Sequence, residues 1–162
     1  MNSPTSTSNK TGFLERGGGW VVAQSVLMVL VLALGPAFPG GWPPVMRQAI
    51  TGILFGLGLL FAVGGVSVLG RNRTIFPRPG ADSCLIQNGV YRVVRHPVYT
   101  GVALLATAWA VGWGSWPTGF AALALFVFLC LKSVREEVWL RGRFPEYADY
   151  ARRVRRIVPW VV

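Results

Sequence analysis

The sequence predicts an all-α, polytopic membrane protein with about four transmembrane helices, the last two in a hairpin, and a C-terminal amphipathic helix. Three observations predict this class. Hydrophobic residues make up 52% of the 162 residues and charged residues only 14%, unlike an average soluble domain. Apolar segments long enough to cross a bilayer recur along the chain. Basic residues are concentrated on one side of those segments.

The charge of the chain points to a membrane rather than to a nucleic acid. Sixteen basic and six acidic residues give a net charge of +10. Alongside so much apolar sequence, this excess favours anionic lipids as partners, and we expect no nucleic-acid partner. One histidine and two cysteines, Cys84 and Cys130, are too few for a Cys/His metal centre or a disulfide framework, so we expect no metal.

The chain begins with a tail and a first span. Residues 1–19 are polar and lack apolar periodicity, which predicts a flexible tail ahead of one membrane domain at 20–162. Residues 20–38 are an apolar run interrupted by Gln24 and Ser25. No clear cleavage site ends this run, so we expect an uncleaved span rather than a signal peptide.

A turn and a second span follow. The prolines and glycines of residues 35–44 predict a turn that ends the first helix. Residues 49–70 carry no charge and form the second span. Within it, Gly52 and Gly56 make a small-residue face, where we expect another helix to approach closely.

The apolar residues 99–131 predict a helical hairpin. A single helix of this length would measure about 50 Å, well beyond the ~30 Å hydrocarbon core. The sequence GWGSWP at 112–117 therefore predicts a turn between the third and fourth helices. Residues 131–143 are charged and extend the fourth helix past the membrane surface.

The C-terminal residues predict an amphipathic helix on the membrane surface. Pro145 suits the first turn of a helix, and Pro159 would end it. Apolar and aromatic residues recur between them at helical spacing, at Tyr147, Tyr150, Val154 and Ile157. Arginines surround this face, as expected for a helix lying on anionic lipid.

Four spans place every basic residue except Arg47, together with all six acidic residues, on one side of the membrane. The positive-inside rule makes that side cytosolic. Candidates for polar chemistry therefore share the cytosolic face.

One stretch on this face, GVYRVVRHPVYTG at 89–101, carries the only histidine of the chain, His96. Pro97 fits the first position of the third helix, where free N–H groups favour an anion. Gly101 in the first turn leaves room for a ligand or for another backbone. The hairpin returns Glu136 and Glu137 to the same face, so we expect this acidic pair opposite the histidine.

Four motifs in this order resemble the isoprenylcysteine carboxyl methyltransferase family and its relatives among the phospholipid N-methyltransferases. They are LGRNRT at 69–74, NGVYRVVRHPVYTG at 88–101, REEVWLRGRFPEYADY at 135–150 and RRVRRIVP at 152–159. The resemblance implies a cofactor-binding portion at 69–159. It also implies S-adenosyl-L-methionine (SAM) as methyl donor and a lipophilic acceptor, isoprenylcysteine carboxylate-like, that enters from the bilayer.

The resemblance further implies which residues form the site. The implied cofactor-binding residues are Tyr91, Arg95, His96, Pro97, Tyr99, Gly101, Glu136 and Glu137. The implied catalytic residues are Glu137, Tyr147 and Arg153. Arg152 and Arg156 stay open beside Arg153 as the arginine that binds an acidic acceptor. Adjacent glutamates point about 100° apart on a helix, so one of the pair faces the pocket and the other pairs with Lys132, Arg135 or Arg141.

Other functions are less consistent with the sequence. Sterol-type membrane reductases share a His-Pro-x-Tyr loop and use NADPH, but they carry Asn and Glu where this chain has Val98 and Val102. A scaffold that has lost its activity would not need intact motifs. Among acceptors, a phospholipid amine, a free isoprenoid acid and a small thiol stay open beside an isoprenylcysteine carboxylate.

Overall fold

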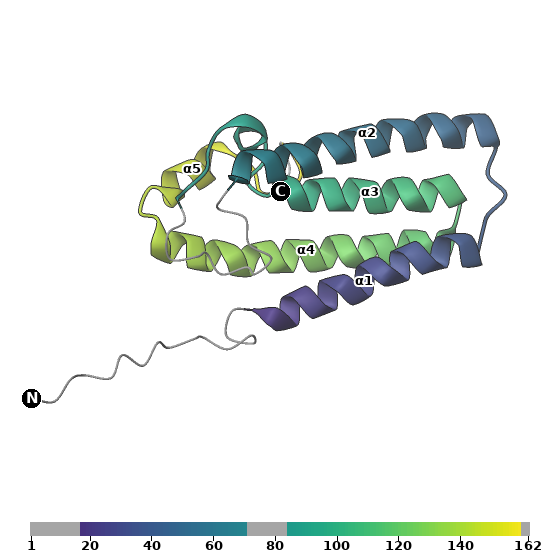
Figure 1. Cartoon of the computed structure of the whole chain (residues 1–162), viewed down its shortest axis with the longest axis horizontal. Helices are drawn as coiled ribbons and strands as arrows, with labels where there is room; N and C mark the ends of the chain where they lie inside the picture. Colours follow the sequence, from purple (N-terminus) through teal and green to yellow (C-terminus); the bar gives the residue numbers. More distant parts are fainter. Residues whose placement is uncertain (1–16, 71–83, 160–162) are drawn as a thin grey trace, which may run out of the picture.

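The computed structural model describes residues 17–70 and 84–159, and these residues form an all-α fold, as predicted. Its elements are α1 (Gly18–Ala37), α2 (Pro44–Leu69), the 3₁₀ helix η2 (Gly89–Arg92), α3 (Pro97–Trp113), α4 (Trp116–Arg143) and α5 (Tyr147–Arg153). The four long helices run antiparallel, with the α1–α2 and α3–α4 connections at one end and α5 at the other (Figure 1). The expected tail and most of the LGRNRT motif lie outside the described residues.

The fold is that of a membrane protein. Among the described helices, α1, α2 and α4 are each long and apolar enough to cross a bilayer. Helix α3 is apolar but has 17 residues, about 26 Å of helix, slightly less than the ~30 Å hydrocarbon core. Large apolar side chains such as Val29, Ile53 and Phe120 are exposed on the outside of the bundle, where lipid would cover them.

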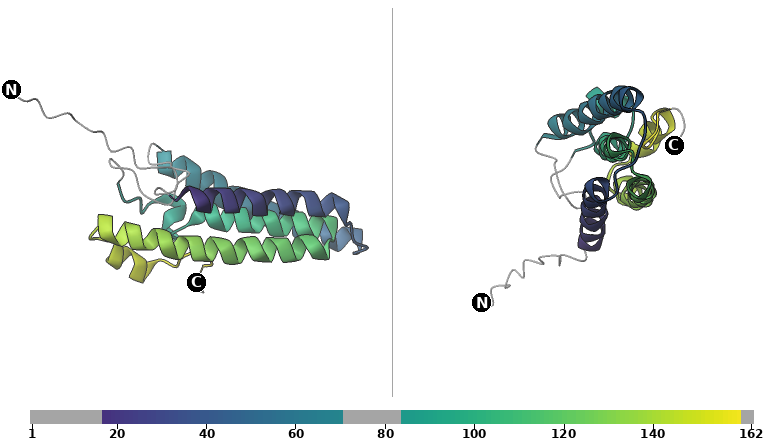
Figure 2. Two further views of the ribbon diagram at one scale, coloured as in Figure 1. Left: turned by 90° about the horizontal axis from the view of Figure 1, so that it is seen from below. Right: turned by 90° about the vertical axis from the view of Figure 1, so that its right-hand side faces the viewer.

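Helix α3 occupies the middle of the bundle. Seen end-on, it lies between α2 on one side and the pair α1 and α4 on the other (Figure 2). Small buried residues along α3, including Gly101, Ala106 and Ala110, let its neighbours approach closely. The apolar core where α1, α3 and α4 meet consists of Val31, Ala106, Ala122, Leu125 and Leu129.

The close contact between α2 and α3 does not use the expected glycines. A Cβ added to Gly52 or Gly56 would meet nothing within 4 Å, whereas one on Gly58 would lie 2.8 Å from Leu105. Gly56 is two residues from Gly58, and hence about 200° round the helix. The Gly52/Gly56 face is therefore not used within the described chain, because the side of α2 that faces α3 passes through Gly58 and Gly65.

The turn between α1 and α2 is shorter than predicted. Helix α1 continues to Ala37 through Pro36, and α2 begins at Pro44. Pro36 has no N–H to donate to Leu32, and the Leu32 carbonyl accepts instead from the indole Nε1 of Trp109, at 3.3 Å. A partner on α3 thus satisfies the group that the proline leaves free, and the helix need not end there.

The hairpin between α3 and α4 agrees with the prediction. Gly114 has φ +62°, a left-handed conformation that glycine adopts readily. Ser115 caps α4 by accepting a hydrogen bond from the Thr118 amide at 3.4 Å. Helix α4 then continues to Arg143, and so presents Glu136 and Glu137 beyond its apolar part.

The C-terminal helix is real but shorter than predicted. Helix α5 ends at Arg153, and Val154 is extended. The expected helix through residues 154–159 was wrong, because the Arg155 and Arg156 carbonyls accept hydrogen bonds from the Arg95 and His96 amides at 2.8 and 3.0 Å. Tyr147 and Tyr150 are also buried in the protein, so this side of α5 does not lie on a membrane surface.

Candidate functional site

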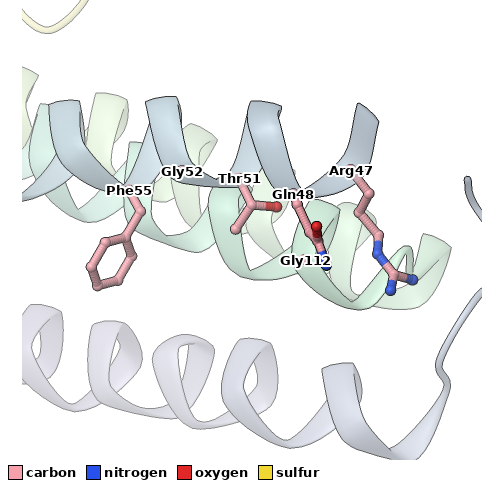
Figure 3. Close-up of a pocket in the computed structure, with 6 residues that line it drawn as sticks. All are labelled: Arg47, Gln48, Thr51, Gly52, Phe55 and Gly112. Atoms are coloured by element: carbon pink, nitrogen blue, oxygen red, sulfur yellow. The ribbon is translucent and has the colours of Figure 1, made fainter. Parts of the chain in front are cut away.

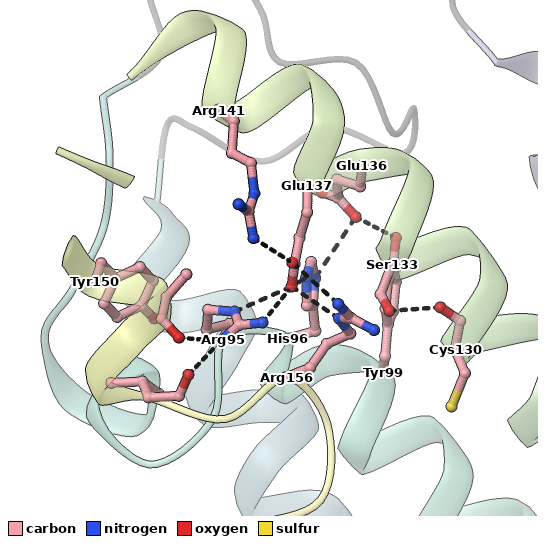
Figure 4. Close-up of polar contacts among 12 residues, drawn as sticks. Arg95, His96, Tyr99, Cys130, Ser133, Glu136, Glu137, Arg141, Tyr150 and Arg156 are labelled. Carbon is pink, nitrogen blue, oxygen red and sulfur yellow. Dashed lines mark hydrogen bonds and ion pairs between the residues drawn. The ribbon is translucent and has the colours of Figure 1, made fainter. Parts of the chain in front are cut away.

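Three segments that are distant in sequence meet at the end of the bundle that carries α5. They are the start of α3, the last turns of α4 and the strand-like residues after α5. In Figure 4 the side chains of Arg95, His96 and Arg156 point toward Glu137, and Tyr99 points toward Glu136. We call Arg95, His96, Glu136, Glu137 and Arg156 the polar cluster.

Glu137 is the centre of the polar cluster. Its side chain is 3% exposed. Arg95 donates to Oε1 from Nε at 3.0 Å and from Nη2 at 2.8 Å, and Arg156 donates to Oε1 from Nε at 3.0 Å. A carboxylate is buried at acceptable cost only when it is paired and hydrogen-bonded. Two guanidinium groups meet that requirement here.

Backbone pairing brings both arginines into place. Besides the two amide bonds described above, Arg95 Nη1 donates to the carbonyls of Ala151, at 2.9 Å, and of Val154. Thr100 Oγ1 in the first turn of α3 donates to the Ile157 carbonyl at 2.7 Å. These bonds join the C-terminal segment to the start of α3, and Arg156 is carried to Glu137 as a result.

Both glutamates contact His96. Its Nδ1 lies 3.6 Å from Glu136 Oε2, and its Nε2 lies 3.4 Å from Glu137 Oε1. Tyr99 stacks on the imidazole with ring centroids 5.3 Å apart and donates to Glu136 Oε2 at 2.8 Å. The expectation that only one glutamate faces the site is therefore too narrow, because the imidazole lies between the two carboxylates.

The tyrosines beside the polar cluster are buried and stay protonated. Burial, helped by the charge of Glu136, raises the pKa of Tyr91 to about 12. Burial likewise raises the pKa of Tyr147 and of Tyr150 well above the ordinary value. Tyr150 donates its hydroxyl to the Tyr91 carbonyl at 2.6 Å. At neutral pH the three phenols stay protonated, so they can donate hydrogen bonds and do not act as bases.

Two buried polar atoms of the site have no hydrogen-bond partner among the described residues. They are the hydroxyl of Tyr147 and Nε2 of His96, which lies 3.4 Å from Glu137 Oε1 without the geometry of a hydrogen bond. Buried polar groups are almost always hydrogen-bonded in folded proteins. Both atoms can therefore bond to a polar ligand or to water.

Three of the predicted site residues lie elsewhere or have another role. Arg153 is exposed, and among the described residues it donates to Asp149 O and Gln87 Oε1, at 3.4 and 3.5 Å. Pro97 and Gly101 are buried against α2, and a Cβ on Gly101 would lie 2.5 Å from the Ala62 amide nitrogen. Gly101 thus makes room for a neighbouring backbone. The structure brings Arg156 to Glu137 in place of Arg153.

Sequence reasoning also missed a polar pair next to the site. Lys132 is 3% exposed and donates from Nζ to Gln24 Oε1 on α1 at 2.6 Å. The signal in the sequence was weak. Gln24 interrupts an apolar run, and Lys132 precedes Glu136 by one helical turn.

A cavity of about 410 Å³ lies at the opposite end of α2 from the polar cluster (Figure 3). Its lining includes Arg47 and Phe55 of α2 and Gly112 of α3. It contains none of the predicted site residues. No group of three metal-ligating side chains occurs in the described part of the chain.

Comparison with known proteins relates the chain to methyltransferases. Residues 46–146 match the model of the phospholipid methyltransferase family. Two rice proteins, both named probable protein-S-isoprenylcysteine O-methyltransferase, from Oryza sativa subsp. indica and subsp. japonica, are 36% identical to the chain over 83 residues. That match covers 48% of this chain and 41% of each relative, so the chain spans less than half of the relatives it matches. Helix α1 precedes the residues that match the family.

Proposed function

The chain belongs to the phospholipid methyltransferase family, and on this premise we propose that it transfers a methyl group from SAM to a lipophilic or lipid-linked acceptor. The observation that carries the proposal is the polar cluster around Glu137, where His96 Nε2 and the nearby Tyr147 hydroxyl have no hydrogen-bond partner among the described residues. We assign the donor site to this cluster, within residues 69–159.

The residues of the cluster suit the polar parts of SAM. The amino-acid end of SAM carries a carboxylate and an ammonium, and its ribose carries two hydroxyls. Arg95, Arg156 and His96 would hold the carboxylate through charge-assisted hydrogen bonds. Glu136 would pair with the ammonium or accept from a ribose hydroxyl, and the Tyr147 hydroxyl would supply a further donor. Tyr91 and Tyr99 would enclose the site.

SAM, when bound, would supply an electrophilic methyl carbon on its sulfonium: the acceptor would bond to that carbon in line as the carbon–sulfur bond breaks, and the electron pair would stay on the departing thioether sulfur. The protein then has to position two molecules and exclude water. The buried ion pairs of Glu137 with Arg95 and Arg156 provide rigid positions for this purpose. A carboxylate acceptor needs no general base, so the protonated tyrosines are compatible with it.

An isoprenylcysteine carboxylate-like acceptor is our leading proposal. The names of the two rice relatives support it. The description of the matched family supports a phospholipid amine as the second candidate. An amine must lose a proton during the reaction. Glu136 would take that proton. Its side chain is 22% exposed, and it accepts a hydrogen bond from Tyr99.

Ligand binding by the detergent-purified protein tests the proposed activity. We expect S-adenosylhomocysteine, the demethylated product of SAM, to bind in calorimetry, and NADPH not to bind. Binding of NADPH without S-adenosylhomocysteine would overturn the proposal. Transfer of a labelled methyl group to a prenylated cysteine or to phosphatidylethanolamine then distinguishes the two acceptors.

A further inference from the structure

A second polar site borders the donor site on the side of α1. Lys132 of α4 lies one helical turn before Glu136, and Gln24 of α1 accepts its hydrogen bond at 2.6 Å. We propose that Lys132 and Gln24 form the recognition site for an oxyanion on the head group of the acceptor. This inference rests on the proposed function and names the residues that select its acceptor.

The charge of Lys132 is only partly compensated in the structure. Lys132 is 3% exposed, and no carboxylate of the described residues lies within 4 Å of its Nζ. An ammonium has three N–H donors, and the described residues take one of them, through the neutral amide of Gln24. The Tyr99 ring lies 5.2 Å from Nζ and adds a cation–π contact.

The charge of Glu136, one helical turn on, attracts Lys132 from beyond direct contact. A buried cation without a carboxylate in direct contact is costly, and buried charges in largely apolar helices often mark a binding site. An oxyanion would use the remaining donors of Lys132 and would neutralise its charge. A phosphate or a carboxylate of a lipid meets this requirement, whereas an amine does not.

Tyr99 connects this site with the donor site. The ring of His96 stacks on the ring of Tyr99, and the ammonium of Lys132 also contacts the Tyr99 ring. The Tyr99 hydroxyl donates a hydrogen bond to Glu136. An oxyanion bound at Lys132 would therefore lie beside the proposed methyl donor without using Arg95, Arg156 or Glu137. The two ligands would occupy adjacent positions separated by one aromatic side chain.

The apolar part of the acceptor has a surface next to this pair. Trp20 and Phe128, each four residues before Gln24 or Lys132, have ring centroids 5.3 Å apart. Val127 and Leu131 of α4 are exposed, as expected for residues that face lipid. A hydrocarbon chain along α1 and α4 would thus reach the bilayer directly from Lys132.

The position of α1 in the sequence supports a role in acceptor choice. The family match begins at residue 46, so it includes Lys132 but not Gln24. The donor-binding residues discussed above lie within or after the matched range. Gln24 lies on α1, outside residues 46–146 that match the family. A residue in this position is suited to recognise an acceptor that is particular to this chain.

The test compares acceptor and donor binding in Lys132→Met and Gln24→Glu. The probes are N-acetyl-S-farnesylcysteine as a carboxylate, its carboxamide as a neutral match, and phosphatidic acid as a competing lipid phosphate. We expect either substitution to raise the KM for the carboxylate at least tenfold and to leave the affinity for S-adenosylhomocysteine within about threefold. Gln24→Glu places a carboxylate beside Lys132 that pairs with its ammonium in place of the acceptor. Because Glu and Gln have nearly the same size, the effect does not come from lost packing.

Two controls separate recognition from structure. Arg135→Met removes an exposed cation of the same helix, and Gln48→Glu adds a carboxylate at the far end of α2. Neither should change the KM. The carboxamide should bind to the wild-type protein and to Lys132→Met with equal affinity. If phosphatidic acid inhibits the wild-type protein but not Lys132→Met, the site also binds a lipid phosphate.

An unchanged carboxylate KM in folded Gln24→Glu protein would overturn the proposal and assign the pair a structural role. Failure of the proposed function is a different result, namely no binding of S-adenosylhomocysteine by the wild-type protein.

Discussion

Glu137 shows how one residue organises the end of the bundle. It accepts hydrogen bonds from Arg95 of the α3 start and from Arg156 of the C-terminal segment. Removing one partner of a buried ion pair leaves the other charge unpaired, which costs more than the pair itself contributes. The three side chains therefore behave as a unit, and their positions depend on one another.

Arg156 and Arg153 offer a matched comparison at this scale. We expect Arg156→Ala to weaken S-adenosylhomocysteine binding at least tenfold, because it removes a guanidinium within 3.0 Å of Glu137. Arg153→Ala should change binding less than twofold, since that side chain is exposed. Calorimetry on both purified variants measures the difference. Equal losses in the two variants would show that Arg156 has no special role.

The sequence predicted much of this site, but not the choice of arginine. His96 with Arg95 before it, and the acidic pair on the next helix, follow from local motifs and from the hairpin. Arg156 could not be chosen over Arg153, because its position depends on the amide of His96 bonding to a carbonyl sixty residues away. Helical periodicity continues through Val154 in the sequence, whereas in the structure the segment after Arg153 pairs with residues at the start of α3.

At the scale of elements, the contact between α2 and α3 fixes where the site begins. Gly101 follows the first turn of α3 and lies against Ala62 and Gly58 of α2. The sequence predicted a close approach of another helix at Gly52 and Gly56, whereas α3 packs at Gly58 and Gly65. Helix α2 contains several glycines, and any of them could allow close packing. Which of them face α3 depends on the rotation of α2 about its axis, which the composition of the helix does not determine.

Gly101→Ala should destabilise the protein and Gly56→Ala should not. A methyl group at Gly101 would lie 2.5 Å from a backbone nitrogen and 2.7 Å from a backbone carbonyl, whereas one at Gly56 meets nothing within 4 Å. Overpacking of this kind costs about 1–3 kcal/mol, and alanine in an open helical position is neutral or slightly favourable. Thermal unfolding in detergent measures both. A wild-type midpoint for Gly101→Ala would mean that α2 and α3 are farther apart than described.

At the scale of the whole molecule, polar and apolar chemistry are separated along the bundle. The polar cluster, α5 and the basic C-terminal residues lie at one end, and the tryptophan-rich turns lie at the other (Figure 1). Tryptophans at a membrane interface and arginines on one side are the expected pattern for an inserted protein. We propose on this basis that the donor site faces the cytosol.

Cysteine labelling tests that orientation. Cys84 is exposed and lies on the side of the polar cluster, whereas Phe38 is exposed near the opposite end. A membrane-impermeant maleimide should label Cys84 only in inside-out vesicles, and should label a cysteine placed at Phe38 only in right-side-out vesicles. Cys130→Ala leaves Cys84 as the single thiol of the first protein, and Cys84→Ala with Cys130→Ala leaves the cysteine at position 38 as the single thiol of the second. The reverse pattern would place the site outside the cytosol.

Calorimetric titration with S-adenosylhomocysteine tests the central claim, that the polar cluster is the donor site of a membrane methyltransferase. We expect micromolar-range binding by wild type and by the variant Arg47→Ala, whose substitution lies at the far end of α2. We expect at least a tenfold loss, about 1.4 kcal/mol, in His96→Ala and in Glu137→Gln, each shown by thermal unfolding to be folded. Wild-type affinity in both cluster variants would contradict it.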